Sequence, residues 1–259
     1  MLISNKSVLI NMSSFKQLFL ANLKIFYRNG SGIFWTILMP TFIYVALSVL
    51  PIGKGDNSGV KYSDYVLPGI LAMTIMQGGI YGLAYWMVDL RSRGVIKRFL
   101  VTPLKQWQLL LSVVASRTIV IFVQTIVLTL IGVIFFQAKF VGNYVSIIIL
   151  TVLGGGIFLL LGLLISNYAK TYEAAAPITS AVGLPLTFLG NIFFPIDGLP
   201  KALKLFAEAL PITYLADGFR QAYLYTFNFQ KIGKDILILA IWLVVMLALT
   251  ISVFKLKED

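Results

Sequence analysis

Long apolar blocks, separated by shorter polar stretches, organise this chain. Each block is about as long as the ~20 residues that a helix needs to cross a bilayer, and the blocks lie at 33–50, 65–88, 109–136, 144–166, 174–194 and 236–254. None alternates apolar and polar positions as a transmembrane strand does, and backbone amides in hydrocarbon must be paired within a helix or a closed barrel. The pattern therefore predicts an all-α membrane protein in which six transmembrane helices form one bundle, residues 33–254.

The first 32 residues follow a different pattern. Basic residues are interspersed in a run whose apolar positions recur at helical spacing, namely Phe15, Leu18, Phe19, Leu23 and Phe26. This predicts an amphipathic helix lying in the membrane interface, with residues 1–12 as a loose cytoplasmic start and 255–259 as a short cytoplasmic tail. A helix packed against a soluble partner is the alternative.

Composition agrees with a lipid environment. The chain is 59% hydrophobic and 12% charged, against roughly 45–50% and 25% in an ordinary soluble domain. It contains no Cys and no His, which excludes disulfides, thiolate or imidazole metal sites, and catalysis by a Cys nucleophile or a His base. We therefore expect no metal site, no bound cofactor and no enzymatic activity in this chain.

Charge predicts the orientation. With the N-terminus inside, the inner side holds thirteen of the 21 basic residues but only four of the ten acidic ones. Cytoplasmic loops are the ones enriched in Lys and Arg, so both termini are predicted to be cytoplasmic in a multi-pass protein of the prokaryotic cell membrane. The net charge of +11 is then explained by the topology in the membrane and by contact with membrane lipid. We infer no nucleic-acid partner from it.

The predicted spans contain a single ionisable residue, Arg117, close enough to the inner end of its span to snorkel. Buried carboxylates mark many proton- and sodium-coupled carriers, so a carrier of that kind is disfavoured. No phosphate-binding loop ending in Gly-Lys-Ser/Thr is present either. We therefore expect ATP and Mg²⁺ to be bound, and ATP hydrolysed, by a separate ATPase subunit.

A basic segment follows the second span. Residues 89–104 combine an apolar stripe of Val95, Phe99 and Leu100 with the basic residues Arg91, Arg93, Lys97 and Arg98. Gly94 would allow a close approach or a bend, and Thr102 and Pro103 end the helix. On charge alone, this segment is equally a loop that only sets the topology. Its residue order, Arg-x-Arg-Gly-x-x-Lys-Arg-x-x-x-Thr-Pro-Leu, resembles the cytosolic coupling segment of type-2 ABC exporter permeases, in particular the daunorubicin-resistance-like group.

A second resemblance to the same family lies after the fifth predicted span. Residues 191–200 read Asn-Ile-Phe-Phe-Pro-Ile-Asp-Gly-Leu-Pro and residues 210–220 read Leu-Pro-Ile-Thr-Tyr-Leu-Ala-Asp-Gly-Phe-Arg. They are similar to the Phe-Pro-x-x-x-Leu-Pro turn and the Pro-Leu-Thr-Tyr-x-x-Asp-x-x-Arg box of that family. Leu210 stands where the family box commonly has Asn, and Arg91 or Val95 where the coupling segment often has Glu. The likeness spans essentially the whole chain, but these departures leave subgroup and substrate open.

The resemblance implies roles for particular residues. It implies that segment 89–104 docks into a groove on the ATPase, and that spans two and five line the central path through Met73, Gln77, Tyr81, Tyr85, Phe188, Asn191 and Phe193. Gly78 and Gly82 offer a close helix approach in a dimer. Residues 199–210 are expected to form a re-entrant or surface helix, and Pro195, Asp217 and Arg220 an outer gate in which Asp217 and Arg220 pair. Ordinary helix packing is the alternative for each lining residue.

The resulting hypothesis is that the chain is the membrane-spanning permease subunit of an ATP-driven exporter. It would work as two permease copies, expected to be identical, with two ATPase copies. Its cargo would be hydrophobic or amphipathic, a drug, an antibiotic or a lipid, moved out of the cytoplasm or inner leaflet. An exporter of lipid-linked polysaccharide, O-antigen or teichoic acid is an alternative, and a non-transport membrane sensor or scaffold is another.

Overall fold

In the computed structural model, residues 2–49, 61–101, 106–138, 141–193, 195–225 and 229–253 are described, and within these ranges the chain forms helices and turns without a strand. The elements are α1 Leu2–Arg28, α2 Gly30–Ile33, the π-helix η1 Phe34–Leu38, α3 Met39–Val49, α4 Tyr62–Ser92, α5 Val95–Leu100, α6 Gln106–Phe136, α7 Tyr144–Tyr168, α8 Tyr172–Leu189, the 3-10 helix η2 Ile196–Gly198, α9 Lys201–Ala209, α10 Pro211–Leu224 and α11 Phe229–Val253.

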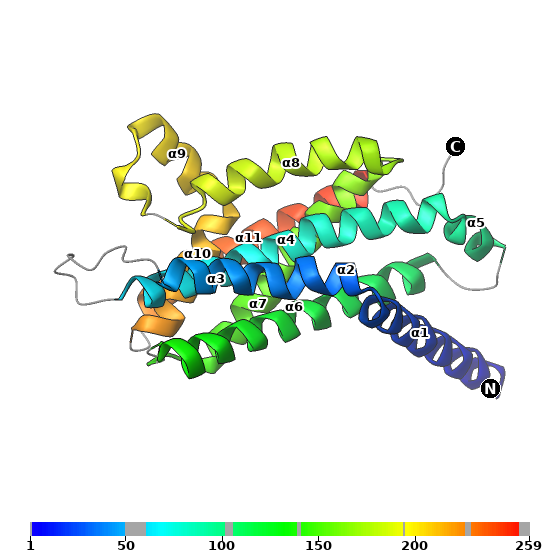
Figure 1. The fold of residues 1–259 in the computed structure, drawn as a ribbon. Coiled ribbons are helices and arrows are strands. Elements are labelled where there is room, and N and C mark those ends of the chain that lie inside the picture. Colours follow the sequence, from blue (N-terminus) through cyan, green and yellow to red (C-terminus); the bar gives the residue numbers. More distant parts are fainter. Residues whose placement is uncertain are drawn as a thin grey trace.

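Helix α4 lies at the centre of the bundle (Figure 1) and packs against α3, α6, α7, α8 and α10. Its closest neighbour is α7, because small residues face each other where the two helices meet. A Cβ atom at Gly162 would lie 2.5 Å from the carbonyl oxygen of Gly79, and one at Gly79 would lie 2.6 Å from Phe158. Glycines at such a contact let helix backbones approach closely in a membrane protein.

Five helices among the described residues are long and apolar enough to cross a membrane, at 30–49, 62–92, 107–136, 144–168 and 232–253. The prediction of six spans is therefore not confirmed. The block 174–194 forms α8, which carries Glu173 in its first turn and contains Pro177 and Pro185, and α8 is not among the five. It nevertheless runs lengthwise along the bundle, beside α4 (Figure 1).

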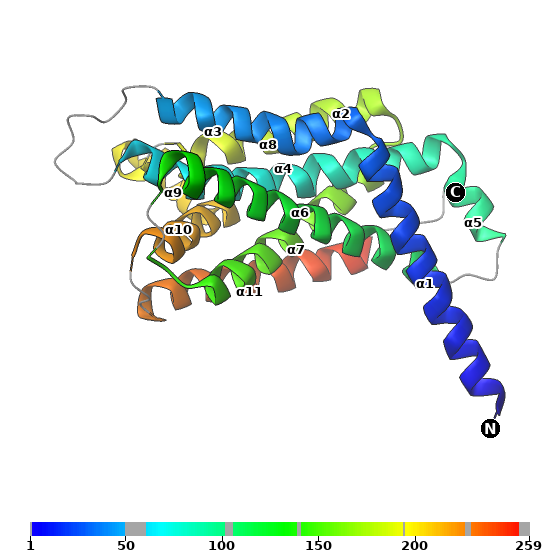
Figure 2. The same cartoon turned by 60° about the horizontal axis from the view of Figure 1, so that its bottom comes forward.

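The N-terminal segment differs from the expected loose start. Helix α1 begins at Leu2 and continues to Arg28, so residues 2–12 are helical. The helix projects beyond the bundle (Figure 2) and packs against α6 near its C-terminal part, where Asn22 donates to the Ser112 hydroxyl at 3.3 Å. Its position in the membrane interface stays a prediction.

A proline changes the helix geometry of the first candidate span. Pro40 has no N–H to donate to the carbonyl of Thr36, its partner in a regular α-helix, and the turn just before it is the π-helix η1. The Gln124 side chain of α6 donates to the Thr36 carbonyl instead. A π-helical turn inside an α-helix is frequent at functional sites, and this one borders the cavity described below.

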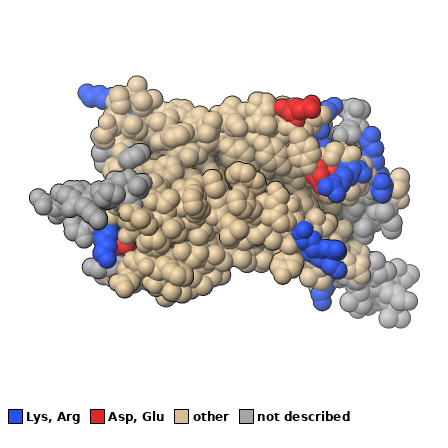
Figure 3. Space-filling model, in the orientation of Figure 1, with Lys and Arg blue, Asp and Glu red and all other residues tan. Residues whose placement is uncertain are grey.

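Charged side chains gather at the two ends of the molecule, with a broad band free of them on the face shown in Figure 3. The start of α1, helix α5 and the last described turn of α11 lie at one end, and α9 and α10 lie toward the other (Figure 1). This arrangement is what a bundle crossing a bilayer requires. The side of the membrane that each end faces stays a prediction.

Candidate functional site

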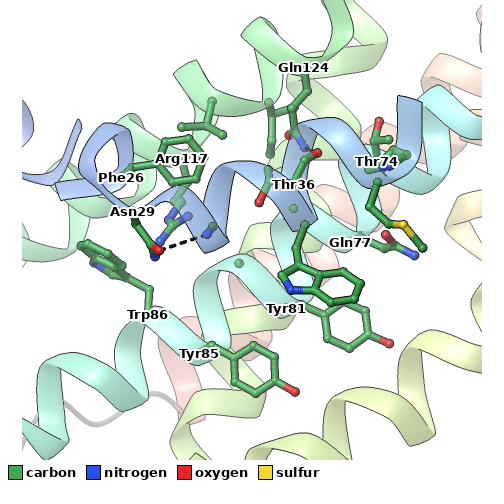
Figure 4. Close-up of a pocket in the computed structure, with 18 of the residues that line it drawn as sticks. Phe26, Asn29, Thr36, Thr74, Gln77, Tyr81, Tyr85, Trp86, Arg117 and Gln124 are labelled. Atoms are coloured by element: carbon green, nitrogen blue, oxygen red, sulfur yellow. Dashed lines mark hydrogen bonds between the residues drawn. The ribbon is translucent and has the colours of Figure 1, made fainter. Parts of the chain in front are cut away.

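A cavity of about 920 Å³ lies between the N-terminal helices, α4 and α6. Its wall is formed by the end of α1, the turn from α2 to α3, the middle and C-terminal parts of α4, and α6 (Figure 4), and Tyr172 of α8 adds to it. The lining is mostly apolar and aromatic, with a few polar groups, as is typical of small-molecule sites.

Arg117 of α6 lines this cavity. Its guanidinium lies over the Trp86 ring, 4.6 Å from the centroid, and 5.4 Å from the centroid of Phe26 (Figure 4). The sequence identifies Arg117 as the single ionisable residue of the predicted spans and predicts only that it snorkels. The structure places its charge against two aromatic rings and next to the cavity.

The predicted pathway residues on α4 divide between the cavity and the core. Gln77, Tyr81 and Tyr85 line the cavity, whereas Met73 is 2% exposed within the hydrophobic core. The rings of Tyr81 and Tyr85 stack with centroids 6.2 Å apart, and Tyr172 continues the stack at 6.1 Å from Tyr85. An aromatic ladder thus runs along one wall.

The two glycines predicted for dimer packing also line the cavity. A Cβ atom at Gly78 would lie 3.2 Å from Gln124 Oε1, and one at Gly82 would lie 3.8 Å from Arg117 Nη1. Both glycines therefore face α6 of the same chain. Their role in a dimer stays a prediction.

The predicted residues at and after span five are not in this cavity. Phe188 is 73% exposed on α8, Phe193 packs partly buried against the core, and Asn191 is buried. Asn191 adopts a positive φ of 54° just beyond the end of α8. Its side-chain amide donates to Asp217 at 2.6 Å, and its carboxamide oxygen accepts from Tyr65 at 3.4 Å.

Asn191 belongs to a polar cluster centred on Arg220 of α10. Arg220 donates to Asp217 at 3.1 Å, to the Ile192 carbonyl at 3.0 Å and to the Asn191 carbonyl. The predicted pair of Asp217 and Arg220 is therefore present. Burial lowers the pKa of Arg220 from its ordinary value, and Tyr65 and Asp217 oppose that shift. Pro195, predicted beside them, is exposed at the start of η2.

Where the segment after span two begins, hydrogen bonds join the end of α4 to α8 and α7. Asp89 accepts hydrogen bonds from Arg93 and from the Tyr172 hydroxyl, both at 2.9 Å, and Arg91 donates to the Ser166 carbonyl. Gly94 adopts a φ of 65° between α4 and α5. It produces the bend that the sequence predicted, because non-glycine residues rarely occupy this region.

Helix α5 follows that bend. Ile96 is buried against the core, whereas the Lys97 and Arg98 side chains are exposed. Thr102 and Pro103 lie outside the described residues. The exposed side chains described in this short helix, Lys97 and Arg98, are therefore both cationic.

The ABC-2 type transporter family model matches residues 13–224 of the chain, a stretch that includes the cavity, the bend at Gly94 and the Arg220 cluster. The chain belongs to this family. The Escherichia coli inner membrane transport permease YadH is 26% identical over 193 residues, which cover 72% of this chain and 75% of YadH. The daunorubicin resistance ABC transporter permease protein DrrB1 of Streptomyces coeruleorubidus is 24% identical, over 86% of this chain and 79% of DrrB1.

A third relative is named for multidrug transport. The probable multidrug ABC transporter permease YbhR of Escherichia coli is 25% identical over 177 residues, which cover 68% of this chain and 48% of YbhR. All three of these relatives are named as permeases. The chain is an ABC-2 permease, and the residues described above form its candidate site.

Several residues of the permease site were missed from the sequence. Phe26, Trp35, Thr36, Gln124 and Tyr172 come from four different elements and meet only in the folded chain. Arg117 gave a signal, since it is the one charge in the predicted spans, and an intramembrane ionisable residue is a functional candidate by default. Among the described residues, no group of three or more Asp, Glu, His or Cys lies together as a metal site would require.

Proposed function

We propose that this ABC-2 permease is the membrane subunit of an ATP-driven exporter whose ATPase is a separate chain. The observation that carries the proposal is α5, a short helix with a cationic exposed side at one end of the bundle. The chain has no phosphate-binding loop of its own, so energy for transport must arrive through a contact with another subunit.

Helix α5 has the properties of a docking element. Ile96 holds it against the bundle, and Lys97 and Arg98 extend from the surface. A short helix with this distribution suits an acidic groove on a soluble partner, since complementary charge fixes register and favours association.

The connection from α5 to the cavity is short. Gly94 joins α5 to the C-terminal end of α4, where Asp89 in the last turns of α4 and Arg93 at its C-cap line the cavity. Tyr172 bonds Asp89 and so ties α8 to this end of α4. A movement of α5 on the ATPase would therefore reach the α4 and α8 walls of the cavity directly.

The cavity favours an amphipathic cargo. Its volume of about 920 Å³ lies within the roughly 300–1,000 Å³ of small-molecule sites, and its aromatic ladder offers apolar faces. By analogy with the family, the proposed assembly contains two permease and two ATPase copies, with export from the cytoplasm or inner leaflet.

Two substitutions test the coupling. Arg98→Glu reverses the charge of α5, and Gly94→Trp places a bulky side chain at a φ of 65°. Both are expected to insert normally but to lose co-purification with the native ATPase, or the stimulation of its turnover. Lys170→Glu reverses another exposed charge, outside α5, and serves as the control. Full coupling in both α5 variants would contradict the proposal.

The same preparation separates the other functional hypotheses. With the complex in vesicles, an exporter of drugs or lipids should show ATPase turnover stimulated by amphipathic cargo. Stimulation only by lipid-linked polysaccharide would favour the polysaccharide exporter instead. A sensor or scaffold would show neither response.

A further inference from the structure

The cavity contains a cation, Arg117, that has no anionic partner among the described residues. No hydrogen bond or ion pair of Arg117 occurs among the described residues, and its interactions there are with the rings of Phe26 and Trp86. A guanidinium offers five N–H donors and no acceptor. Inside a candidate membrane span such a charge is costly unless something pairs with it.

The carboxylate on the cavity wall already accepts hydrogen bonds from other residues. Asp89 is the one carboxylate among the lining residues, and it accepts from Arg93 and from Tyr172. The described ion pairs of the chain are Arg93 with Asp89 and Arg220 with Asp217, and neither involves Arg117. The protein thus supplies aromatic support for the guanidinium but no counter-charge within the described residues.

A ligand in the cavity can reach Arg117, which lines it. Gly82 lies beside the guanidinium, since a Cβ atom built there would be in van der Waals contact with Arg117 Nη1 at 3.8 Å, so a larger side chain at this position would take up space next to the charge. The two rings fix the guanidinium from the Phe26 and Trp86 sides (Figure 4). A planar, preorganised guanidinium matches phosphate and carboxylate oxygens in a bidentate geometry.

Beyond Arg117 the wall is suited to an apolar chain. Trp35, Met39, Ile43, Tyr81 and Ile121 line the same cavity. A free inorganic anion would leave these surfaces unused, and a cationic amphiphile would be repelled by Arg117. The combination fits a molecule with a negative head and an apolar body.

We propose that this cavity binds an anionic amphiphile, whose phosphate or carboxylate group pairs with Arg117 and whose apolar part lies along the Tyr81 side. The inference rests on the proposed function in taking this molecule as the class of cargo. Binding itself needs no ATPase, so it is measured separately from coupling.

The test uses the full-length permease in neutral maltoside micelles with radiolabelled dodecyl phosphate as the probe. Replacing Arg117 by Gln is expected to weaken binding by about tenfold or more, because a charge-assisted hydrogen bond is lost. Arg117→Lys keeps the positive charge but loses the planar, bidentate geometry, so its affinity should lie between those of the unmodified chain and Arg117→Gln. Lys170→Gln, which removes an exposed charge outside the cavity, should bind as the unmodified chain does.

Competition identifies the ligand chemistry. Unlabelled dodecyl phosphate should displace the probe, whereas dodecyltrimethylammonium and inorganic phosphate at the same concentration should not. Equal binding by Arg117→Gln and the unmodified chain would overturn the proposal, as would equal displacement by the cationic amphiphile or by phosphate alone. Gel filtration shows whether Arg117→Gln is folded, and the competition on the unmodified chain carries the test if it is not.

The two proposals fail in different ways. If Arg117→Gln still co-purifies with the ATPase but has lost the probe, both stand. If binding is unchanged while the α5 variants lose the ATPase, the anionic ligand is wrong and the coupled permease remains. If the α5 variants keep full coupling, the proposed function fails whatever the probe shows.

Discussion

The side-chain amide of Gln124 in α6 donates to the backbone carbonyl of Thr36, 88 positions earlier in the chain. Thr36 lies four residues before Pro40, which has no N–H to offer it. A polar side chain in one candidate span therefore satisfies a carbonyl that a proline leaves without its α-helical donor in another. The bond also joins α6 to the N-terminal wall of the cavity, since both residues line it.

Replacing Gln124 by Leu is expected to lower the free energy of unfolding by about 1 kcal/mol, because the partly buried Thr36 carbonyl loses its donor. Thermal denaturation of the purified permease in detergent measures the effect. Gln77→Leu is the matched control, since Gln77 lines the same cavity and no hydrogen bond of its side chain occurs among the described residues.

A second background sharpens this test. Pro40→Ala returns an N–H to the helix, so Thr36 regains a donor. In that background Gln124→Leu should cost less than it does in the unmodified chain. Equal costs in the two backgrounds would show that Gln124 acts in some other way.

The contact between α4 and α7 depends on Gly162. A methyl group there would lie 2.5 Å from the Gly79 carbonyl oxygen, so Gly162→Ala must move one helix and is expected to cost about 1–3 kcal/mol. Gly30→Ala is the control, because nothing lies within 4 Å of its Cβ position, and alanine favours a helix over glycine. Melting temperatures that fall equally in both variants would contradict the close contact.

Arg220 holds the chain just after α8 against α10. Arg220→Gln removes the donor to the Ile192 carbonyl and the partner of Asp217. We expect a loss of about 2 kcal/mol, below the value for a fully buried pair, because Asp217 is about one-third exposed. Hydrogen exchange of residues 186–193 should accelerate. Lys201→Gln, at an exposed position, should leave this exchange unchanged, and unaltered exchange in Arg220→Gln would count against the cluster.

The bend at Gly94 is a matter of backbone conformation. Its φ is 65° and nothing lies within 4 Å of a Cβ atom built there, so Gly94→Val should impair ATPase stimulation through strain, at a cost of about 1–3 kcal/mol. Gly94→Asn should retain more of the stimulation, because Asn tolerates positive φ. If Asn and Val variants lose stimulation equally, side-chain size at the docking surface, and not backbone conformation, is responsible.

Local patterns were enough to predict much of this permease. The apolar blocks predicted its helical nature, the turn at Gly94 and the Asp217–Arg220 pair followed from residue types and spacing, and the two ordered motifs indicated the family that the comparison shows. Helix formation in an apolar segment, a glycine in the left-handed region and an i, i+3 pair each depend on residues close together in the chain.

Local patterns were not enough to predict the number of candidate spans or the residues of the site. Apolarity alone predicted six spans, the fifth at 174–194, whereas α8, with Glu173 and two prolines, is not among the five candidate helices. Likewise, spacing placed Met73 and Gln77 on adjoining faces of one helix, and only packing sends Met73 into the core and Gln77 to the cavity.

The amino-acid sequence by itself determined which segments are helical and apolar, where basic residues concentrate, and that one arginine interrupts the predicted spans. Only the tertiary structure decided that Arg117 lies over Trp86 beside a cavity, and that Asn191 joins Arg220 instead of lining it. The reason is physical: helix formation and transfer into lipid depend on neighbours in the chain, whereas a cavity and the position of a charge beside it depend on how distant helices pack.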